Sequence, residues 1–448
     1  CTGFTACTQN ARSFFNTLVR LMYPFVSGWG IISPGGNGHM ARHQVRQGLC
    51  NRAPRARGWL VTFLVLLACL PASSVSASGR VPLLSSPVAR CQSAVPPSAF
   101  NVSDSPASSR APALAVYGSS VHVAWEEGTR IYHRALIQGA WTTSRSVATG
   151  EQPALAVDAS GVAHLVLVNE FAENYEIYYC RWNGSTWSLP RNVSNTSGVS
   201  SSPDIALGPD GVLHVVWADN TPGYSVIYHG CWNGTYWLNE PIPHAVGGAP
   251  AISVSPANVV HVVWQDRDAV GAPYEIYHSQ LLQGAWSLPE NLSDSPGATS
   301  VIASLASDRD ERTHVTWQER VGPRNAVYYT YGWVGYWSVP ECISSQGADA
   351  YVPSEAVGPG AAVYIGWDEG VRAVYRQRAG GRDEWSQPAT VKSDPSGVTD
   401  LVLAIDSQGQ FHAVWSNRVT TDNWDVYYQR LSSRFVLPVL IKGRLVED

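Results

Sequence analysis

The sequence has little charge and no basic excess. Charged residues make up 15% of its 448 residues, and the formal net charge is −5. A protein that binds nucleic acid normally presents a basic face to the phosphate backbone. This composition therefore argues against nucleic acid as a partner.

Closely spaced metal ligands are also missing. The chain has eight cysteines, but it has no Cys-x-x-Cys and no His pair of the kind that binds zinc. We predict no metal site and no cofactor, with calcium kept as an open alternative. Cys91, Cys180, Cys231 and Cys342 follow the predicted export signal, and the sequence leaves open whether they are free thiols or disulfide-bonded.

The apolar run near the N-terminus is too short to cross a membrane comfortably. Residues 59–70 form a run of about 12 residues, whereas a spanning helix needs about 20. The run follows several arginines and precedes Val75-Ser76-Ala77, a small-x-small cleavage pattern. This order is typical of an export signal.

We therefore divide the N-terminal part of the chain into three segments. Residues 1–39 are predicted to lie upstream of the true start at Met40, residues 40–77 to form a signal peptide, and residues 78–96 to form a linker. The sequence Leu66-Leu67-Ala68-Cys69 offers an alternative, a lipid anchor at Cys69. Either route predicts a secreted or cell-surface protein.

The rest of the chain repeats a His-x-x-Trp motif at intervals of about 48 residues, in the range expected for propeller blades or solenoid turns. Two copies are degenerate, one without the Trp and one without the His. The copies start at His122, His164, His214, His261, His314, Tyr364 and His412. We predict that the tryptophans pack in the core. The histidines are expected to be hydrogen-bonded structural residues, because seven dispersed positions cannot bind one metal ion.

Each repeat contains four β-strand signals in the same order. An apolar run is followed by a turn, the His-x-x-Trp run, an Ile-Tyr or Val-Tyr pair, and a Gly…Trp segment. No amphipathic helical window competes with this pattern. We predict an all-β, seven-bladed β-propeller of four-stranded antiparallel blades over residues 97–431, followed by a tail over residues 432–448.

The seventh repeat lacks a fourth strand of its own. Residues 101–106 copy residues 291–296, which follow a fourth strand elsewhere in the chain. We therefore predict that the N-terminal strand closes the last blade, which would pair sheet edges that are otherwise prone to aggregation. The alternative is the C-terminal run over residues 435–441, which contains Pro438 and has no Gly or Trp signal.

A carboxylate or amide stands two residues after most of the repeated tryptophan positions, at the start of a variable loop. The acidic members are Glu127, Asp219, Asp266, Glu319 and Glu369, and the arginines that follow such positions are Arg267, Arg320 and Arg418. Three interpretations stay open: local structural bonding, a site for sugars or a cation, or a glycosidase site. The last requires two carboxylates roughly 5–10 Å apart.

Tryptophans in the turns between the third and fourth strands form a second candidate site. The residues are Trp182, Asn183, Trp232, Asn233 and Trp333. An exposed Trp beside an amide suits stacking on a sugar ring with hydrogen bonds to its hydroxyls. The alternative is that these residues shield the edge of each blade.

The repeat unit resembles those of bacterial exported propellers of the sialidase-like superfamily, which carries Asp-box (BNR) repeats. The resemblance rests on Asp-x-x-Gly-x-x-His-Val-x-Trp, Ile-Tyr-Tyr and Asn-Gly-x-x-Trp-Ser-x-Pro, as they stand in this chain. It implies a propeller with either sialidase-like activity or a lectin function. The segment from Trp182 to Trp187 keeps the Gly and Trp of the Asp-box but lacks its Ser-x-Asp, and the Arg-Ile-Pro motif of sialidases is absent.

These observations predict an exported, monomeric binding module whose partner is a glycan or a cell-surface component. The alternatives are an exo-acting, sialidase-like glycoside hydrolase that uses the carboxylates and arginines above, and a propeller that binds other proteins.

Overall fold

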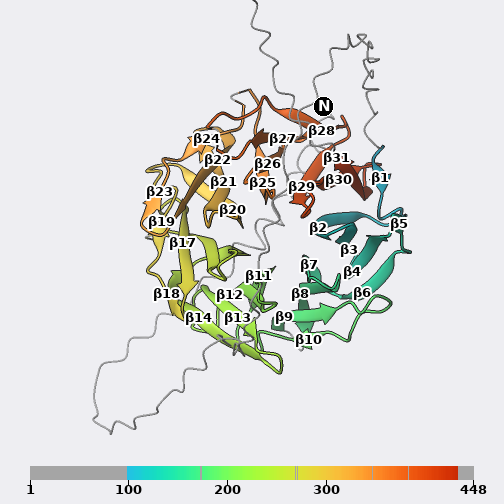
Figure 1. Cartoon of the computed structure of the whole chain (residues 1–448), viewed down its shortest axis with the longest axis horizontal. Helices are drawn as coiled ribbons and strands as arrows, with labels where there is room; N and C mark the ends of the chain where they lie inside the picture. Colours follow the sequence, from blue (N-terminus) through green and yellow to red (C-terminus); the bar gives the residue numbers. More distant parts are fainter. Residues whose placement is uncertain are drawn as a thin grey trace, which may run out of the picture. The chain divides into compact units, whose positions relative to one another are not determined.

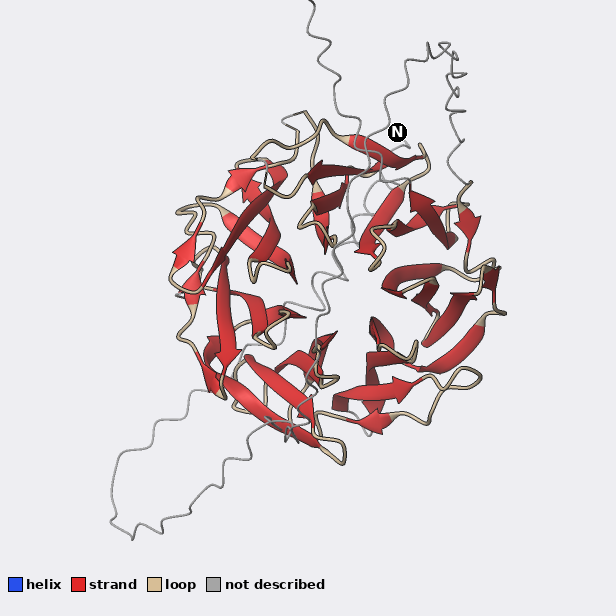
Figure 2. Cartoon of the chain, viewed as in Figure 1, coloured by secondary structure: helices blue, strands red, loops and turns tan. Residues whose placement is uncertain are grey.

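The computed structural model describes residues 98–171, 174–267, 269, 271–345, 347–381 and 383–431. Within these residues, seven antiparallel sheets form a ring around a central axis and no helix occurs (Figure 1, Figure 2). The prediction of a seven-bladed β-propeller with four-stranded blades is confirmed. The predicted signal, linker and C-terminal tail lie outside the described residues.

The blades follow one another along the chain. Blade 1 contains β2 (Ser109–Tyr117), β3 (Ser120–Glu127), β4 (Arg130–Ile137), β5 (Ala140–Trp141) and β6 (Arg145–Thr149). Blade 2 contains β7 (Glu151–Val157), β8 (Ala163–Phe171), β9 (Asn174–Arg181) and β10 (Arg191–Asn192). Blade 3 contains β11 (Ser200–Leu207), β12 (Leu213–Asp219), β13 (Val226–Trp232) and β14 (Trp237–Val246).

Blade 4 contains β15 (Gly248–Val254), β16 (Val260–Asp266), β17 (Glu275–Leu282), β18 (Ala285–Trp286) and β19 (Glu290–Asn291). Blade 5 contains β20 (Thr299–Ser307), β21 (Thr313–Val321), β22 (Arg324–Trp333), β23 (Tyr336–Trp337) and β24 (Glu341–Cys342). Blade 6 contains β25 (Tyr351–Val357), β26 (Val363–Asp368), β27 (Arg372–Arg378) and β28 (Ala389–Ser393). Blade 7 contains β29 (Val398–Ile405), β30 (Phe411–Arg418), β31 (Trp424–Leu431) and β1 (Phe100–Asn101).

The N-terminal strand closes the last blade, as predicted. In β1, Phe100 pairs with Tyr428 and Asn101 with Tyr427 of β31. The rival segment, residues 435–441, lies outside the described residues.

The repeated tryptophans of the second strands form the core between blades, as predicted. All of them are almost completely buried: Trp125, Trp217, Trp264, Trp317, Trp367 and Trp415. Trp217 of blade 3, for example, packs in one cluster with Val166 and Val168 of blade 2. Each buried Trp removes roughly 150–250 Å² from water, so these contacts hold neighbouring blades together.

The first strand of every blade contains a bulge with one non-glycine residue at positive φ. These residues are Ala111, Gln152, Ser202, Ala249, Ile302, Val352 and Asp400. Six of their amide N–H groups donate to a side-chain oxygen of the preceding blade, as Gln152 does to Glu126 at 2.6 Å and Asp400 to Asp368 at 2.7 Å. The strained backbone, which costs of order 1 kcal/mol at each residue, is thus used to join neighbouring blades.

The second-strand histidines are hydrogen-bonded to the third strand, in accordance with the predicted structural role. In blades 1, 3 and 4 the partner is a second histidine, with Nδ1 to Nε2 distances of 3.1, 3.0 and 3.1 Å for His122–His133, His214–His229 and His261–His278. In blades 2, 5 and 7 the partner is a tyrosine hydroxyl, at 2.7, 2.7 and 2.9 Å for His164–Tyr179, His314–Tyr329 and His412–Tyr428.

Whether the second-strand histidine bonds to a histidine or to a tyrosine correlates with the residue that begins the turn before it. The three blades with tyrosine have an aspartate at the start of the turn between the first and second strands, Asp158, Asp308 and Asp406. The blades with paired histidines have no aspartate at this position. An imidazole between a carboxylate and a hydroxyl has one acceptor and one donor available, which fixes its tautomer.

Candidate functional site

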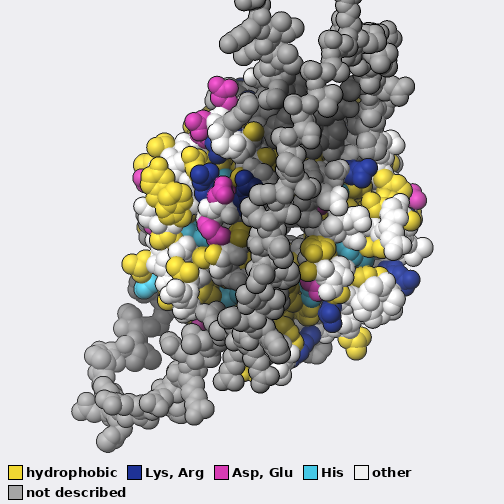
Figure 3. All heavy atoms as spheres, viewed as in Figure 1, with side chains coloured by type: hydrophobic (Ala, Val, Ile, Leu, Met, Phe, Trp, Pro, Cys, Tyr) yellow, Lys and Arg dark blue, Asp and Glu magenta, His cyan; other side chains and the backbone are white. Residues whose placement is uncertain are grey.

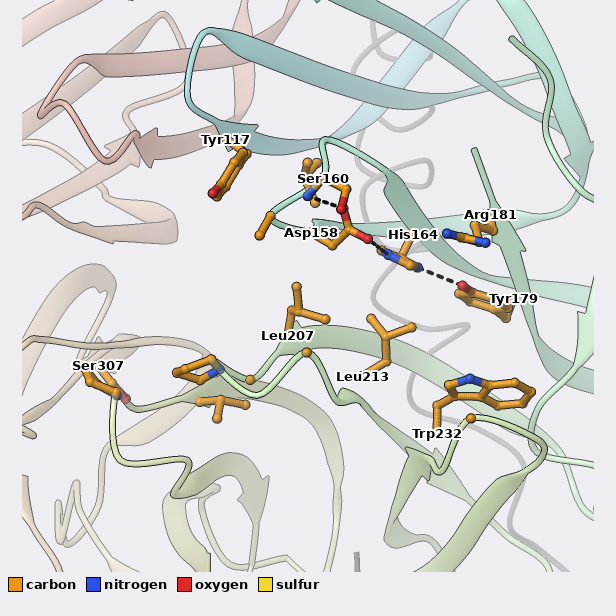
Figure 4. Close-up of a pocket in the computed structure, with 18 of the residues that line it drawn as sticks. Tyr117, Asp158, Ser160, His164, Tyr179, Arg181, Leu207, Leu213, Trp232 and Ser307 are labelled. Atoms are coloured by element: carbon orange, nitrogen blue, oxygen red, sulfur yellow. Dashed lines mark hydrogen bonds and ion pairs between the residues drawn. The ribbon is translucent and has the colours of Figure 1, made fainter. Parts of the chain in front are cut away.

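A groove of about 930 Å³ opens between blades 2 and 3 and extends to the central axis (Figure 4). Its walls include Asp158, His164, Tyr179, Arg181 and Arg191 from blade 2 and Trp232 from blade 3. The turns that join first and second strands complete the groove at the axis. We call this the blade 2–3 groove.

A chain of three polar side chains lies on the blade 2 wall of the groove (Figure 4). The Tyr179 hydroxyl is 2.7 Å from His164 Nδ1, and His164 Nε2 lies 3.5 Å from the carboxylate of Asp158. Burial lowers the pKa of His164 and raises the pKa of Tyr179 to about 12. At neutral pH, Tyr179 is therefore protonated and donates to a neutral imidazole.

Asp158 is held as a carboxylate. Burial alone would raise its pKa, but hydrogen bonds from the amides of Val162 and Ser160 outweigh that effect and the pKa is lowered. Those amides donate to Asp158 Oδ1 at 2.9 and 2.8 Å. The carboxylate thus faces His164 and can stabilise a positive charge that develops on the imidazole.

Blades 5 and 7 contain the same arrangement of an aspartate, a histidine and a tyrosine, but there the aspartate is buried. The Asp158 side chain is 24% exposed, against 0% for Asp308 and 4% for Asp406. In blade 5, Arg378 of blade 6 covers Tyr329 and donates to its hydroxyl. The copy in blade 2 lines the blade 2–3 groove.

The outer part of the groove is basic and aromatic. Arg181 and Arg191 are both exposed, and the Arg191 guanidinium lies 4.9 Å from the centre of the Trp232 ring. The one carboxylate that lines the groove is Asp158. This arrangement offers an apolar surface and several N–H donors to one ligand, as small-molecule sites commonly do.

The structure places the predicted rim residues in different environments. Trp182 is 5% exposed and packs against His133 and Trp187, so the expectation that it is exposed is wrong. Asn183 and Asn233 accept hydrogen bonds from amides of their own turns. Of the five predicted residues, only Trp232 lines the groove.

Trp333 lies on a different surface. It is 48% exposed and stacks on Tyr336 at 5.1 Å, in blade 5; Figure 3 shows hydrophobic side chains gathered at this rim, over β22 to β24. The strand register explains its position, because Trp232 pairs with Trp237 whereas Gly332, not Trp333, pairs with Trp337. Trp333 is therefore one residue further along and points to the other face of its blade.

The predicted loop carboxylates bond locally. Four of them lie within hydrogen-bonding distance of the tryptophan N–H two residues earlier, at 3.4, 3.4, 3.0 and 3.3 Å for Glu127, Asp219, Glu319 and Glu369. Asp266 accepts the amide N–H of Arg267 at 2.6 Å. They belong to five different blades, and none lines the groove. The geometry is that of the local structural alternative.

The predicted arginines also stay near their own loops. Arg267 lies over Tyr274, with 5.3 Å between guanidinium and ring centre, and Arg418 donates to the carbonyl of Thr421 at 2.6 Å. Arg320 pairs with Asn325, one residue before the end of the β21–β22 strand pair. None of the three lines the groove.

The repeat pattern alone did not predict the group formed by Asp158, His164, Tyr179, Arg181 and Arg191. One signal was present, since an aspartate in the first turn accompanies a tyrosine after the Ile-Tyr pair in blade 2. The feature that distinguishes blade 2 from blades 5 and 7 is an opening between blades, which depends on packing and leaves no local pattern.

Within the described residues, no cluster of three or more His, Cys, Asp or Glu side chains could hold a metal ion. None of the described elements is a helix long and apolar enough to cross a membrane.

Comparison with known proteins gives a likeness in fold. No protein-family model and no curated protein sequence matches the chain. An ulvan lyase of polysaccharide lyase family 25 superposes with a TM-score of 0.58 and 10% identity, over 74% of this chain and 96% of that one. The same kind of lyase bound to -[GlcA(1-4)Rha3S]- gives 0.57 and 11%, over 74% and 96%.

A microbial sialidase is also similar, with a TM-score of 0.45 and 14% identity over 74% of this chain and 68% of that one. At these identities the likenesses concern the propeller fold.

Proposed function

We propose that this protein binds carbohydrate in the blade 2–3 groove. The observation that carries the proposal is Trp232, a half-buried ring on the wall of an open groove, with the Arg191 guanidinium over the ring and Arg181 also lining the groove. An aromatic surface beside several N–H donors suits a sugar, which has an apolar ring face and peripheral oxygens. The volume of about 930 Å³ also falls within the range of ligand sites, roughly 300–1,000 Å³.

The fold supports this choice. The superposing ulvan lyases, by their names, act on a polysaccharide. We further propose that the chain is exported, that it acts outside the cell as a monomer, and that its partner is a free or cell-surface glycan.

Replacing Trp232 with alanine is expected to weaken glycan binding about tenfold or more, because a central aromatic anchor commonly carries that much affinity. The measurement is a glycan array followed by titration calorimetry on the best ligand. Trp333→Ala is the matched control, since Trp333 is an exposed rim tryptophan outside the groove. Equal binding by the wild type and Trp232→Ala would count against the groove as the site.

A glycan-cleaving enzyme is a second candidate, favoured by the hydrogen-bonded Asp158–His164–Tyr179 chain that lines the groove. While Tyr179 Oη takes a proton from a sugar carbon next to a carboxylate, its own proton passes to His164 Nδ1. The electron pair of that C–H bond forms a C=C bond as the neighbouring C–O bond breaks. The leaving oxygen takes the proton from Tyr179, which recovers its proton from His164. The groove has one carboxylate, so this elimination fits it better than hydrolysis by two carboxylates.

Removing the Tyr179 hydroxyl tests this second candidate. Tyr179→Phe is expected to lower kcat about 100-fold or more, in line with the loss of a general acid–base group, with little change in glycan binding. Cleavage is followed through the ultraviolet absorbance of the unsaturated product. Tyr428→Phe, the same change in the closed copy, is expected to retain activity. Full activity in Tyr179→Phe would exclude this role.

A further inference from the structure

One position in the fourth strand is occupied by a glutamate in some blades and by an arginine in others. The register places it opposite the third-strand His or Tyr that bonds to the second strand. In blades 3, 4 and 5 this residue is Glu240, Glu290 and Glu341, opposite His229, His278 and Tyr329. In blades 1 and 2 it is Arg145 and Arg191, opposite His133 and Tyr179.

The glutamates connect neighbouring blades through hydrogen bonds. Each accepts the indole N–H of the fourth-strand tryptophan in the next blade, at 3.2, 2.9 and 2.9 Å for Trp286, Trp337 and Trp385. Such bonds to a carboxylate are stronger than those between neutral groups. The Glu–Trp pair therefore joins neighbouring blades at three successive joints, between blades 3 and 6.

At the blade 2–3 groove this position is occupied by Arg191 and not by a glutamate. The indole N–H of Trp237, the next fourth-strand tryptophan, is buried and has no acceptor among the described residues. The Arg191 guanidinium lies instead over Trp232 and donates to the carbonyl of Thr235 at 3.4 Å. On the groove wall, the hydrogen-bond donor Arg191 thus replaces the acceptor glutamate of blades 3 to 5. The exposed Arg181 lines the same groove.

No groove carboxylate balances these two arginines. Asp158 accepts two backbone amides and faces His164. Excess positive charge on the groove wall attracts an anion, and a guanidinium binds a planar carboxylate or a sulfate through paired N–H donors.

We infer that the blade 2–3 groove selects anionic sugars, whose carboxylate or sulfate group contacts Arg191 and Arg181. This inference rests on the proposed carbohydrate binding and adds the class of sugar. At the blade 1–2 joint Arg145 likewise replaces the glutamate, and the Trp187 N–H has no acceptor among the described residues. There the buried Trp182 packs on His133 and Trp187, and Arg145 does not line the blade 2–3 groove.

Arg145 and Arg191 therefore provide a matched pair of charge reversals. With the full chain, we would measure affinity for polygalacturonate, dextran sulfate and uncharged dextran, at low and high salt. Arg191→Glu is expected to weaken binding to whichever polyanion the wild type binds by roughly 10- to 100-fold, the loss of charged hydrogen bonds. Arg145→Glu is expected to stay within about twofold, because screening weakens the effect of a distant surface charge.

A folding check accompanies this experiment. Arg191→Glu is expected to melt at or above the wild-type temperature, because the introduced carboxylate can accept the Trp237 N–H as in blades 3 to 5. Weakened binding in a variant of unchanged stability then reports on the ligand contact rather than on folding.

The outcomes separate the two proposals. If both reversals weaken polyanion binding equally, or if Arg191→Glu leaves it unchanged, selection by Arg191 is overturned. If the wild type binds an uncharged glycan through Trp232 and prefers no polyanion, the inference fails while carbohydrate binding stands. If no polysaccharide on the array or in this set binds, the proposed function itself fails and the inference falls with it.

Discussion

Acidification from pH 7 to pH 4 is expected to unfold the propeller. Blades 1, 3 and 4 each contain a buried, hydrogen-bonded histidine pair. Burial lowers the pKa of His122, His214 and His261 to about 4 and that of His229 to about 3. The folded protein therefore keeps these imidazoles neutral at pH values at which an unfolded chain would protonate them.

The direction of this pH dependence follows from the number of protons bound by the folded and unfolded states. An unfolded histidine titrates near its ordinary pKa of 6.5. Between pH 6.5 and about pH 4 the unfolded state therefore binds more protons than the folded state, and the free energy of unfolding decreases as the pH is lowered. The stabilisation is complete above 6.5 and is lost as pH falls toward 4. Each shift of this size corresponds to about 3 kcal/mol. Three such groups match the whole stability of a typical domain, about 5–15 kcal/mol.

Urea unfolding at pH 7, 5.5 and 4.5 measures this effect, with tryptophan fluorescence as the signal. The double change Ser255→Asp and His278→Tyr is the informative variant, because it gives blade 4 the Asp, His and Tyr arrangement of blade 2. With one histidine pair fewer and a carboxylate beside His261, the dependence of stability on pH should become shallower. A wild-type unfolding midpoint that stays constant down to pH 4.5 would contradict the explanation.

The blade count and the closure of the ring could be predicted from sequence because both depend on local, repeated signals. The buried Trp217 and the turn before it recur in nearly every unit, and the segment after Asn101 copies the one after Asn291. Such patterns specify strands and their order. They do not specify what fills the space between two blades.

Register is the first feature that the pattern missed. Trp217 pairs with Tyr228, but in blade 6 Trp367 pairs with Val374, so the Val-Tyr pair there is shifted by one residue relative to the Ile-Tyr pairs. A shift of one residue moves a side chain to the opposite face of a strand. The same effect separates Trp333 from Trp232, two residues that look equivalent in sequence.

The site is the second feature. Trp182 and Trp232 occupy the same position in successive blades, yet one is buried and the other lines a groove. The difference depends on residues of the neighbouring blade, His133 beside Trp182 and Arg191 beside Trp232. Contacts between residues 49 and 41 positions apart, across two sheets, are not visible in a repeat pattern.

Loss of the N-terminal strand is expected to destabilise the whole ring. Val102 is fully buried among Trp125 and Val414, and its amide donates to the Val426 carbonyl at 2.7 Å. Asn101 donates to the Asp425 carboxylate at 2.8 Å, and Phe100 stacks on Trp141 of blade 1 at 5.1 Å. These residues therefore join blade 7 to blade 1 as well as completing its sheet.

A chain that begins at residue 107 should melt roughly 5–10 °C lower than one that begins at residue 98, because it loses a buried valine worth roughly 1.5–3 kcal/mol together with several hydrogen bonds. It should also aggregate, since the edge of β31 becomes unpaired. Thermal unfolding and size-exclusion chromatography measure both effects. If the shorter chain remained monomeric and equally stable, another segment would have to pair with β31, and the run over residues 435–441 would be the first to delete.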